Sequence, residues 1–184
     1  MPTPYFSTIP YLSYDMLADN TYRATVNILQ RLKIRDVIKA DMMEMYEYIV
    51  KDGERVEDLA FRYYGWTGYH WIILLANDIY DPYRDWPMSG EDLVAFLRGQ
   101  YSTPTQDGLI YTYQTVHHYE DANGIGIDYD TYVSLPANER KRVTLYDYWL
   151  EANETKRRIR LIDKKYLSLL EEELIRLMKE NPLR

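Results

Sequence analysis

Residues 44–78 constrain the fold of this chain more than any other segment, because one strand pattern is followed there by two helix patterns. The run EMYEYIV at 44–50 is rich in tyrosine and β-branched side chains and stops at Asp52-Gly53, which predicts a strand ending in a turn. The run after it places apolar side chains at helical spacing, and Gly65 follows as a C-cap. The predicted apolar face consists of Val56, Leu59, Ala60 and Tyr63.

A second helix is predicted directly afterwards, in GYHWIILLAND. Its apolar side chains lie nearly all round the helix, which is typical of a buried helix, and Asn77-Asp78 ends it. The prolines of DPYRDWPMS predict a loop at 81–89. Ser89 then opens another helix, with Asp92 as its capping partner, and Gly99 ends it.

The N-terminal segments carry different signals. Three prolines among aromatic side chains at 1–20 disfavour a helix, so this segment is predicted to be an extended arm lying on another surface, of this chain or of a partner. From Tyr22 to Lys39 the spacing of apolar residues is mostly helical.

Residues 101–135 are predicted to form a polar linker and a hairpin. The linker covers 101–108, and the two strands of the hairpin are the β-rich runs at 109–121 and 127–135. The turn between these strands lies at Ala122-Asn123-Gly124.

The last part of the chain is predicted to contain short strands and one long helix. Strands are expected at 143–150 and 157–162, and a helix through 143–153 is an alternative for the first of them. Asp163 caps an amphipathic helix that packs on its own chain or docks onto a partner. Its apolar stripe is Leu167, Leu170, Leu174 and Leu177.

Composition excludes several classes of function. The chain has 20 Tyr and 4 Trp against 3 Phe, which suits either a tyrosine-rich strand core or surfaces that become buried in a complex. The absence of cysteine excludes thiol catalysis, disulfides and cysteine-based zinc sites. No stretch approaches the roughly 20 apolar residues of a membrane span. The start, MPTPYFSTIPYLSYD, does not have the pattern of a secretory signal.

Charge is distributed unevenly along the chain. The net charge of −7 argues against general nucleic-acid binding. Between residues 139 and 165, nine Lys and Arg face five Asp and Glu, so this segment carries +4 and the remainder −11. This basic segment either docks onto an acidic neighbour or forms a solvated surface.

No pattern of a catalytic or metal site is present. His70 lies in an apolar helix and is predicted to pack, while His117 and His118 are neighbours on a predicted strand and should face opposite sides. DANGIGIDYD matches a calcium loop only in part, because Ile125 and Tyr132 stand where oxygen ligands are needed. The sequence therefore predicts no catalytic residue, no cofactor and no metal, and the chain is predicted not to be an enzyme.

The run YIVKDGERVEDLAFRYYG, followed by HWIILLAND, resembles a LysM module. The matching positions are Asp52-Gly53-Glu54, Leu59-Ala60, Tyr63-Tyr64-Gly65, Leu74-Leu75 and Asn77. The resemblance implies a βααβ fold with its returning strand around 83–88. LysM modules usually bind N-acetylglucosamine polymers, so a carbohydrate-binding module is the alternative function, supported by the aromatic residues Trp66, Tyr69 and Trp71.

A longer resemblance, to the baseplate wedge protein 53 family of contractile phages, spans nearly the whole chain. It rests on segments that occur in the same order in that family: YFSTIPYLSYD, VNILQRLKIRD, YEYIVKDGERVEDLAFRYYG, YHWIILLANDIYDPYRDWPMS, TVHHYED and KRRIRLIDKKYLSLLEEEL. The resemblance implies a structural protein of the tail baseplate in the virion, assembled in the host cytoplasm. The partners that it implies are the wedge core bundle proteins and the lysozyme-like-fold wedge protein that initiates the sheath, with tube and sheath initiators as further candidates.

The expected fold is therefore α+β, in three consecutive segments. An N-terminal arm and helix cover 1–43, a LysM-like module covers 44–98, and a β-rich region with a C-terminal amphipathic helix covers 99–184. The expected function is to join neighbouring wedge proteins during tail assembly, without nucleic acid or membrane as partner. The candidate protein-interaction residues are Tyr5, Phe6, Tyr11, Trp66, Tyr69, Trp71, Tyr80, Tyr83, Trp86, Arg157, Arg158 and Arg160.

Overall fold

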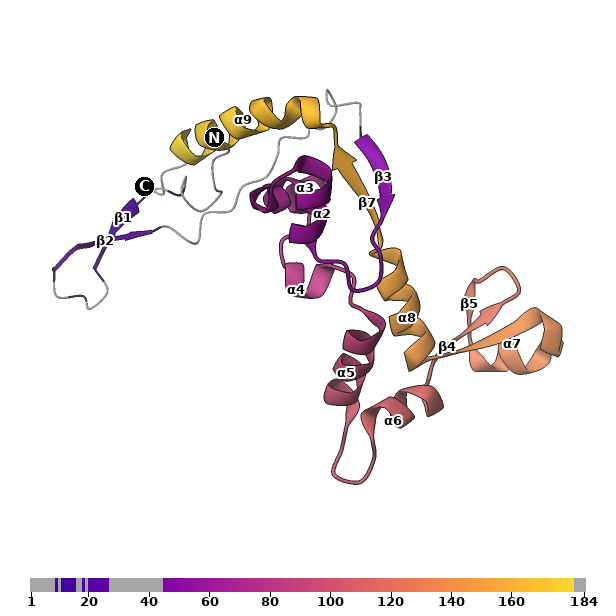
Figure 1. Ribbon diagram of the computed structural model, residues 1–184. Coiled ribbons are helices and arrows are strands. Elements are labelled where there is room, and N and C mark those ends of the chain that lie inside the picture. The colour runs from indigo at the N-terminus through magenta and orange to yellow at the C-terminus, as the bar shows by residue number, and fades with distance from the viewer. Residues whose placement is uncertain (1–8, 10, 16–17, 19, 27–44, 181–184) are drawn as a thin grey trace. The chain divides into compact units, whose positions relative to one another are not determined.

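The computed structural model describes residues 9, 11–15, 18, 20–26 and 45–180 (Figure 1). The chain divides into two compact units, and both are discontinuous in sequence. Unit 1 takes residues 1–49, 54–85 and 159–184, and unit 2 takes residues 50–53 and 86–158. The three consecutive segments expected from the sequence stay a prediction.

A strand, two helices and a returning strand form the body of unit 1. The strand β3 (Met45–Ile49) leads into α2 (Val56–Tyr64), and the short η2 (Thr67–Tyr69) leads into α3 (His70–Ala76). β3 is hydrogen-bonded to β7 (Arg158–Ile162), and Figure 1 shows the two strands side by side with arrows in opposite directions. The strand and the two helices predicted for this part of the chain are confirmed.

Gly65 separates the two helices for a conformational reason. Its φ of 86° lies in the left-handed region, and its backbone N–H donates to the carbonyl of Phe61 at 2.8 Å. This geometry favours glycine, so α2 ends where the sequence predicts. Glu57 and Asp58 lie in the first turn of α2, where negative charge stabilises the helix dipole.

The apolar faces of these elements form the core of unit 1. Ile72 and Ile73 are fully buried in α3, and Leu59 is 1% exposed in α2. From β7, Ile159 and Leu161 point into the same core, and the buried Tyr64 hydroxyl donates to the carbonyl of Ile162 at 2.9 Å. Burial raises the pKa of Tyr64, so its hydroxyl stays protonated and keeps this hydrogen bond.

The returning strand lies elsewhere than the sequence predicted. Residues 82–85 form the helix α4 (Pro82–Asp85), where the prolines predicted a loop over 81–89 and the LysM resemblance implied a strand around 83–88. The carboxylate of Asp81 accepts from the backbone N–H of Tyr83, and the Asp81 carbonyl accepts from Arg84, which starts a helical turn instead. The strand hydrogen-bonded to β3 is β7, more than a hundred residues along the chain.

Asn77 fixes the second edge of β7. Its side-chain Nδ2 donates to the carbonyl of Arg160 at 2.8 Å, and its Oδ1 accepts from the backbone N–H of Arg160 at 2.7 Å. Nδ2 also donates to the carbonyl of Ile73 within α3. One carboxamide therefore imitates a neighbouring strand and ties the end of α3 to the sheet.

We expect the substitution Asn77→Ala to destabilise unit 1 by about 2 kcal/mol, because three hydrogen bonds are lost at a partly exposed site. The amide of Arg160 should then exchange its hydrogen faster, as measured by nuclear magnetic resonance. Asn77→Asp keeps the acceptor for the Arg160 N–H but turns a carboxylate oxygen toward the two carbonyls, so it should destabilise unit 1 at least as much as alanine does. Unchanged exchange at Arg160 in the alanine variant would contradict this role.

The C-terminal helix packs on its own chain. η4 (Lys164–Tyr166) leads into α9 (Leu167–Glu180), and the Asp163 carboxylate accepts from the backbone N–H of Lys165, as the predicted cap requires. Leu170 and Leu174 are buried, and the Tyr69 hydroxyl donates to Glu171 at 3.2 Å. The apolar face of α9 therefore packs on its own chain, which is the first of the two alternatives predicted from the sequence.

The N-terminal arm contains a hairpin. β1 (Tyr11–Tyr14) pairs antiparallel with β2 (Arg23–Val26), with Tyr11 opposite Val26 and Tyr14 opposite Arg23. The helix predicted from Tyr22 is therefore wrong at its start, where cross-strand pairing outweighs helical spacing. Residues 27–39 of that prediction, and most of residues 1–10, lie outside the described residues.

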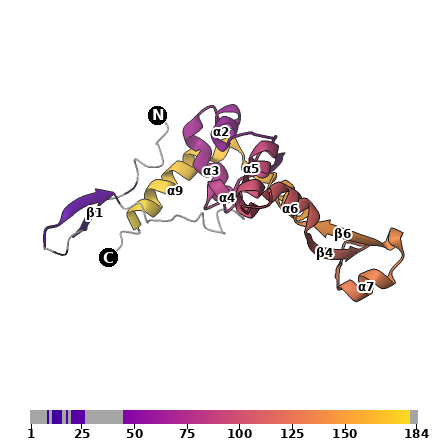
Figure 2. The same ribbon diagram turned by 90° about the horizontal axis from the view of Figure 1, so that it is seen from below.

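Unit 2 combines a three-stranded sheet with helices. The sheet has the order β5-β4-β6, and Figure 2 shows β4 and β6 side by side. The elements of unit 2 are α5 (Gly90–Tyr101), α6 (Gly108–Gln114), β4 (Val116–Asp121), β5 (Gly126–Ile127), α7 (Tyr129–Ser134), η3 (Ala137–Glu139), β6 (Arg140–Thr144) and α8 (Leu145–Thr155). Ser89 caps α5 as predicted, although the helix continues past Gly99 to Tyr101.

Three expected strand segments of unit 2 are helices instead, so this part of the chain is not β-rich. Residues 108–114, 129–134 and 145–155 are helical, the last as the alternative prediction had it. Each helix begins at a side chain that accepts from its first turn: Asp107 from Leu109 and Ile110, Asp128 from Thr131, and Thr144 from Asp147. These caps outweigh the strand preference of tyrosine, threonine and valine. The hairpin turn at 122–124 is confirmed.

The capping box of α8 makes the stability of unit 2 depend on pH. Hydrogen bonds from the Thr144 hydroxyl and backbone N–H hold the pKa of Asp147 below its usual range. The contribution of such a group is complete above the pKa of the unfolded chain, near 4, and is lost as the pH falls through the folded pKa. We expect Asp147→Asn to lower stability by about 1 kcal/mol at neutral pH. The difference between the thermal melts of the two proteins should shrink as the pH falls below 4, and a constant gap would contradict the expectation.

Candidate functional site

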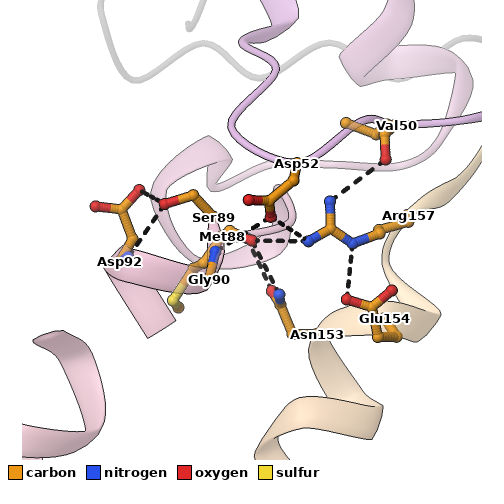
Figure 3. A network of polar contacts seen from close by, with 9 residues as sticks. All are labelled: Val50, Asp52, Met88, Ser89, Gly90, Asp92, Asn153, Glu154 and Arg157. Atoms are coloured by element: carbon orange, nitrogen blue, oxygen red, sulfur yellow. Dashed lines mark hydrogen bonds and ion pairs between the residues drawn. The ribbon is translucent and has the colours of Figure 1, made fainter. Parts of the chain in front are cut away.

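Arg157 is the centre of a polar network within unit 2 (Figure 3). Its guanidinium donates to the carbonyls of Val50 at 3.4 Å and Met88 at 3.3 Å. It also forms ion pairs with Asp52 at 2.7 Å and Glu154 at 2.8 Å. Burial by itself would lower the pKa of Arg157, but the hydrogen bonds to Glu154 and Asp52 outweigh it, and its pKa is raised. The side chain is thus a permanent cation that joins three segments.

Asn153 and Asp52 complete this network. The Asn153 carboxamide donates to the carbonyl of Met88 at 2.9 Å and accepts from the Met88 backbone N–H at 2.8 Å, as Asn77 does with Arg160 in unit 1. Asp52 accepts from the backbone N–H of Gly90 at the start of α5. The network therefore positions the start of α5 and the end of α8 against residues 50–53.

Three of the aromatic interaction candidates, Trp66, Tyr69 and Trp71, lie in unit 1 at η2 and the start of α3. Tyr69 and Trp71 are buried, at 8% and 4% exposure. Trp66 packs edge-on against Tyr69 with 5.0 Å between the ring centroids, and its ring covers Gly68 so closely that a Cβ there would clash. These side chains contribute to the packing of unit 1.

The remaining candidates differ in exposure. Tyr83 is 94% exposed on α4, and Tyr80 is half exposed beside it in the sequence. Tyr11 is exposed on the hairpin β1–β2, while Tyr5 and Phe6 lie outside the described residues. The others are Trp86, which is half-buried, and Arg158 and Arg160, which are exposed at alternate positions of β7.

Unit 2 carries stacked aromatic side chains that the sequence did not single out. Tyr113 of α6 stacks on Tyr146 of α8 at 4.3 Å, and His117 stacks on Tyr148 at 3.9 Å between ring centroids. Tyr113 and Tyr148 remain partly exposed. Sequence spacing did not indicate these pairs, because Tyr113, Tyr146 and Tyr148 were assigned to strands, whereas they lie on the helices α6 and α8.

The two neighbouring histidines do not face opposite sides of β4. A register shift between Val116 and His118 interrupts the alternation, and the Nδ1 atoms of His117 and His118 lie 2.8 Å apart. His118 also contacts Glu120 at 2.9 Å. The hydrogen bond to His118, joined by a nearby Lys141, lowers the pKa of the Glu120 carboxyl. The bulge is the physical reason why the prediction was wrong.

Neither a three-ligand metal group nor a membrane-spanning helix occurs among the described residues. Among them, no group of three His, Asp or Glu side chains is placed to hold a metal ion. Asp121, the first residue of the partial calcium pattern, accepts from the backbone N–H groups of Asn123 and Ile125 and so builds the hairpin turn. In the same part of the chain, no helix is long and apolar enough to cross a membrane.

Comparison with known proteins identifies the family to which this chain belongs. Residues 1–142 match the family model described as Base plate wedge protein 53. The chain therefore belongs to the base plate wedge protein 53 family. It is 28% identical to the Baseplate wedge protein gp53 of Enterobacteria phage T4 over 149 residues, which cover 73% of this chain and 74% of that protein. Membership implies a structural role in the wedge of a phage tail baseplate, in association with other baseplate components.

Proposed function

We propose that this chain joins neighbouring wedge proteins during assembly of a contractile phage tail. The observation that carries the proposal is the hairpin β1–β2, in which Tyr11, Tyr14 and Tyr22 are 74%, 54% and 66% exposed. Its residues 11, 13–14 and 21–25 are all exposed, so both faces of the two-stranded sheet are open. An isolated hairpin is marginally stable in water, and a partner surface would stabilise it.

Further exposed apolar side chains suit a chain with several docking surfaces. One such surface in unit 1 consists of Tyr80 and Tyr83, and a second in unit 2 consists of Ile110, Tyr111 and Tyr113 of α6. Once one surface is bound, the effective concentration of the others rises, which suits a connecting role. The proposed partners are the wedge core bundle proteins and the lysozyme-like-fold wedge protein that initiates the sheath. We further propose that tube or sheath initiators touch the same surfaces and that assembly takes place in the host cytoplasm.

The body of unit 1 is proposed to be a LysM-like module used as a scaffold. Its order is β3, α2, α3 and then β7, with residues 77–157 inserted before the returning strand. Of the aromatic side chains on which the carbohydrate-binding alternative rests, Tyr69 and Trp71 are buried and Trp66 packs on Gly68. Their packing favours a protein-docking scaffold over a glycan groove.

The proposal is tested with tails of the phage that encodes this chain. Quantitative mass spectrometry of purified tails should find the chain in a whole-number multiple of the tail's rotational symmetry. Infection with a stop codon in its gene should give separate wedges instead of joined baseplates, and the Tyr11→Ser/Tyr14→Ser variant should restore joining poorly. Absence of the chain from the tail, or normal baseplates without it, would refute the proposal.

A further inference from the structure

Residues 121–139 form an exposed lobe of unit 2, called here the acidic lobe. It runs from the end of β4 through β5 and α7 to η3, and Figure 2 shows α7 beside β4. None of its 19 residues is buried. A segment without a buried side chain gains little stability from the hydrophobic effect. Packing within the lobe therefore does not explain its three exposed apolar residues, Ile125, Tyr129 and Val133.

The acidic lobe is nevertheless held in one shape by local contacts. Asp121 closes the turn between β4 and β5, and Asp128 caps α7 by accepting from Thr131 at 2.7 Å. At the other end of α7, the Arg140 guanidinium donates to the carbonyls of Tyr132 and Val133 and lies over the Tyr132 ring at 4.8 Å. The Tyr132 ring packs on Tyr119 of β4 at 4.4 Å. The lobe is therefore preorganised, which lowers the ordering cost of binding.

One face of α7 presents Tyr129, whose ring also lies 5.5 Å from that of Tyr119 in β4, and Val133. They are four residues apart, so they share one side of the helix, and they are 61% and 53% exposed. Ile125, in the turn before β5, is 61% exposed. Tyrosine is among the residues that contribute most to binding at protein interfaces, because it buries a large apolar area while keeping a polar hydroxyl.

The charge of the acidic lobe determines what can cover this face. Its four charged residues are Asp121, Asp128, Asp130 and Glu139, and it contains no Lys, Arg or His. Hydrogen bonds from backbone N–H groups hold the pKa values of Asp121 and Asp128 below their usual range, so both stay ionised down to acidic pH. Two copies of the lobe facing each other would repel, whereas a basic surface would attract it.

We propose that the acidic lobe docks, through Tyr129 and Val133, into an apolar pocket bordered by lysine and arginine side chains on another protein of the wedge. The proposal rests on the proposed function and adds the chemistry of one contact to it. Apolar burial of the two side chains gives affinity, and the four carboxylates give orientation and a fast, salt-dependent encounter.

The test uses the full chain and purified wedges of the same phage assembled without it. Binding is measured by sedimentation or light scattering at several salt concentrations. The variant Tyr129→Ser/Val133→Ser removes the apolar face, and Asp130→Lys reverses one exposed charge on α7. Matched controls are Phe61→Ser, which changes an exposed aromatic residue of α2 outside the proposed docking surfaces, and Glu151→Lys, which changes an exposed carboxylate of α8.

We expect both lobe variants to weaken wedge binding about tenfold or more, as loss of an interface anchor does, and both controls to bind like the wild type. Wild-type binding should also fall as salt rises, and Asp130→Lys should reduce that dependence. Equal binding by lobe and control variants, or binding independent of salt, would overturn this inference while the joining function stands.

Two other outcomes separate the remaining alternatives. If the wild type self-associates and Asp130→Lys abolishes that association, a second copy covers the lobe and the basic partner is wrong. If the wild type does not bind the wedges at all, the proposed function fails together with the inference. Hydrogen exchange of residues 116–121 in both lobe variants checks that β4 stays folded, so that a loss of binding is not a loss of structure.

Discussion

Replacing Arg157 with leucine is expected to destabilise unit 2 by about 3 kcal/mol, at the lower end of the range for breaking a buried ion pair. The Arg157 side chain is 11% exposed, but its partners Asp52 and Glu154 are 65% and 53% exposed, so water can compensate the two carboxylates in part. The Val50 carbonyl also loses its charged donor, whereas the Met88 carbonyl keeps the hydrogen bond from Asn153.

Two further variants separate the roles of charge and geometry. Arg157→Lys keeps the charge, but one ammonium group cannot reach four acceptors from the positions of a guanidinium fork, so we expect about half the loss. Arg158→Leu changes the exposed neighbour and should alter stability by less than about 0.5 kcal/mol.

Hydrogen exchange followed by mass spectrometry is the appropriate measurement, because a chain with two compact units need not unfold in one step. Peptides covering residues 50–53 and 86–92 should lose protection in Arg157→Leu and keep it in Arg158→Leu. Equal effects of the two variants would show that the network of Figure 3 adds no stability.

Local signals in the sequence were sufficient for the elements of unit 1. Gly65 adopts a left-handed φ and ends α2, and the apolar spacing of residues 56–76 places both helices correctly. The partner of β3 could not be predicted in this way. Pairing with β7 depends on the fold of everything between the two strands, and no local pattern records it.

In unit 2 two sequence signals conflict, helix caps and strand preference, and the helix caps determine the fold. Asp107 and Asp128 stand directly before runs that are rich in tyrosine and threonine, and each accepts hydrogen bonds from the helix that follows. The position of an aspartate at a helix start is visible in the sequence, and it should outweigh weak strand preference in short segments. The stacking of Tyr113 on Tyr146 follows only from the packing of those helices.

For the candidate site, charge and aromatic content were informative but did not distinguish surface from interior. Arg157 and Arg158 are adjacent and chemically identical, yet one is the centre of a buried network and the other is exposed. Burial of an arginine depends on carbonyls and carboxylates that other segments supply. The acidic lobe, by contrast, had a readable signal, since 19 consecutive residues contain four carboxylates and no base.

The second large effect is expected from Gly108→Ala, at the start of α6. A Cβ at this buried position would lie 2.5 Å from the carbonyl oxygen of Arg98 and 2.5 Å from the backbone nitrogen of Ser102. Both atoms belong to the backbone at the end of α5, so no side-chain rotation relieves the overlap, and the two helices must separate. We expect a loss of about 3 kcal/mol, the upper end of the usual range for overpacking.

Gly99→Ala is the matched control, because the same methyl group is added to a glycine with nothing within 4 Å of the new atom. Gly99 lies inside α5, where alanine is preferred over glycine by about 1 kcal/mol, so this variant should be more stable than the wild type. Hydrogen exchange of peptides from α5 and α6 should therefore change in opposite directions in the two variants. If both alanines were tolerated equally, the close approach of α5 and α6 at Gly108 would be wrong, and with it the placement of the exposed face of α6 that we propose as a docking surface.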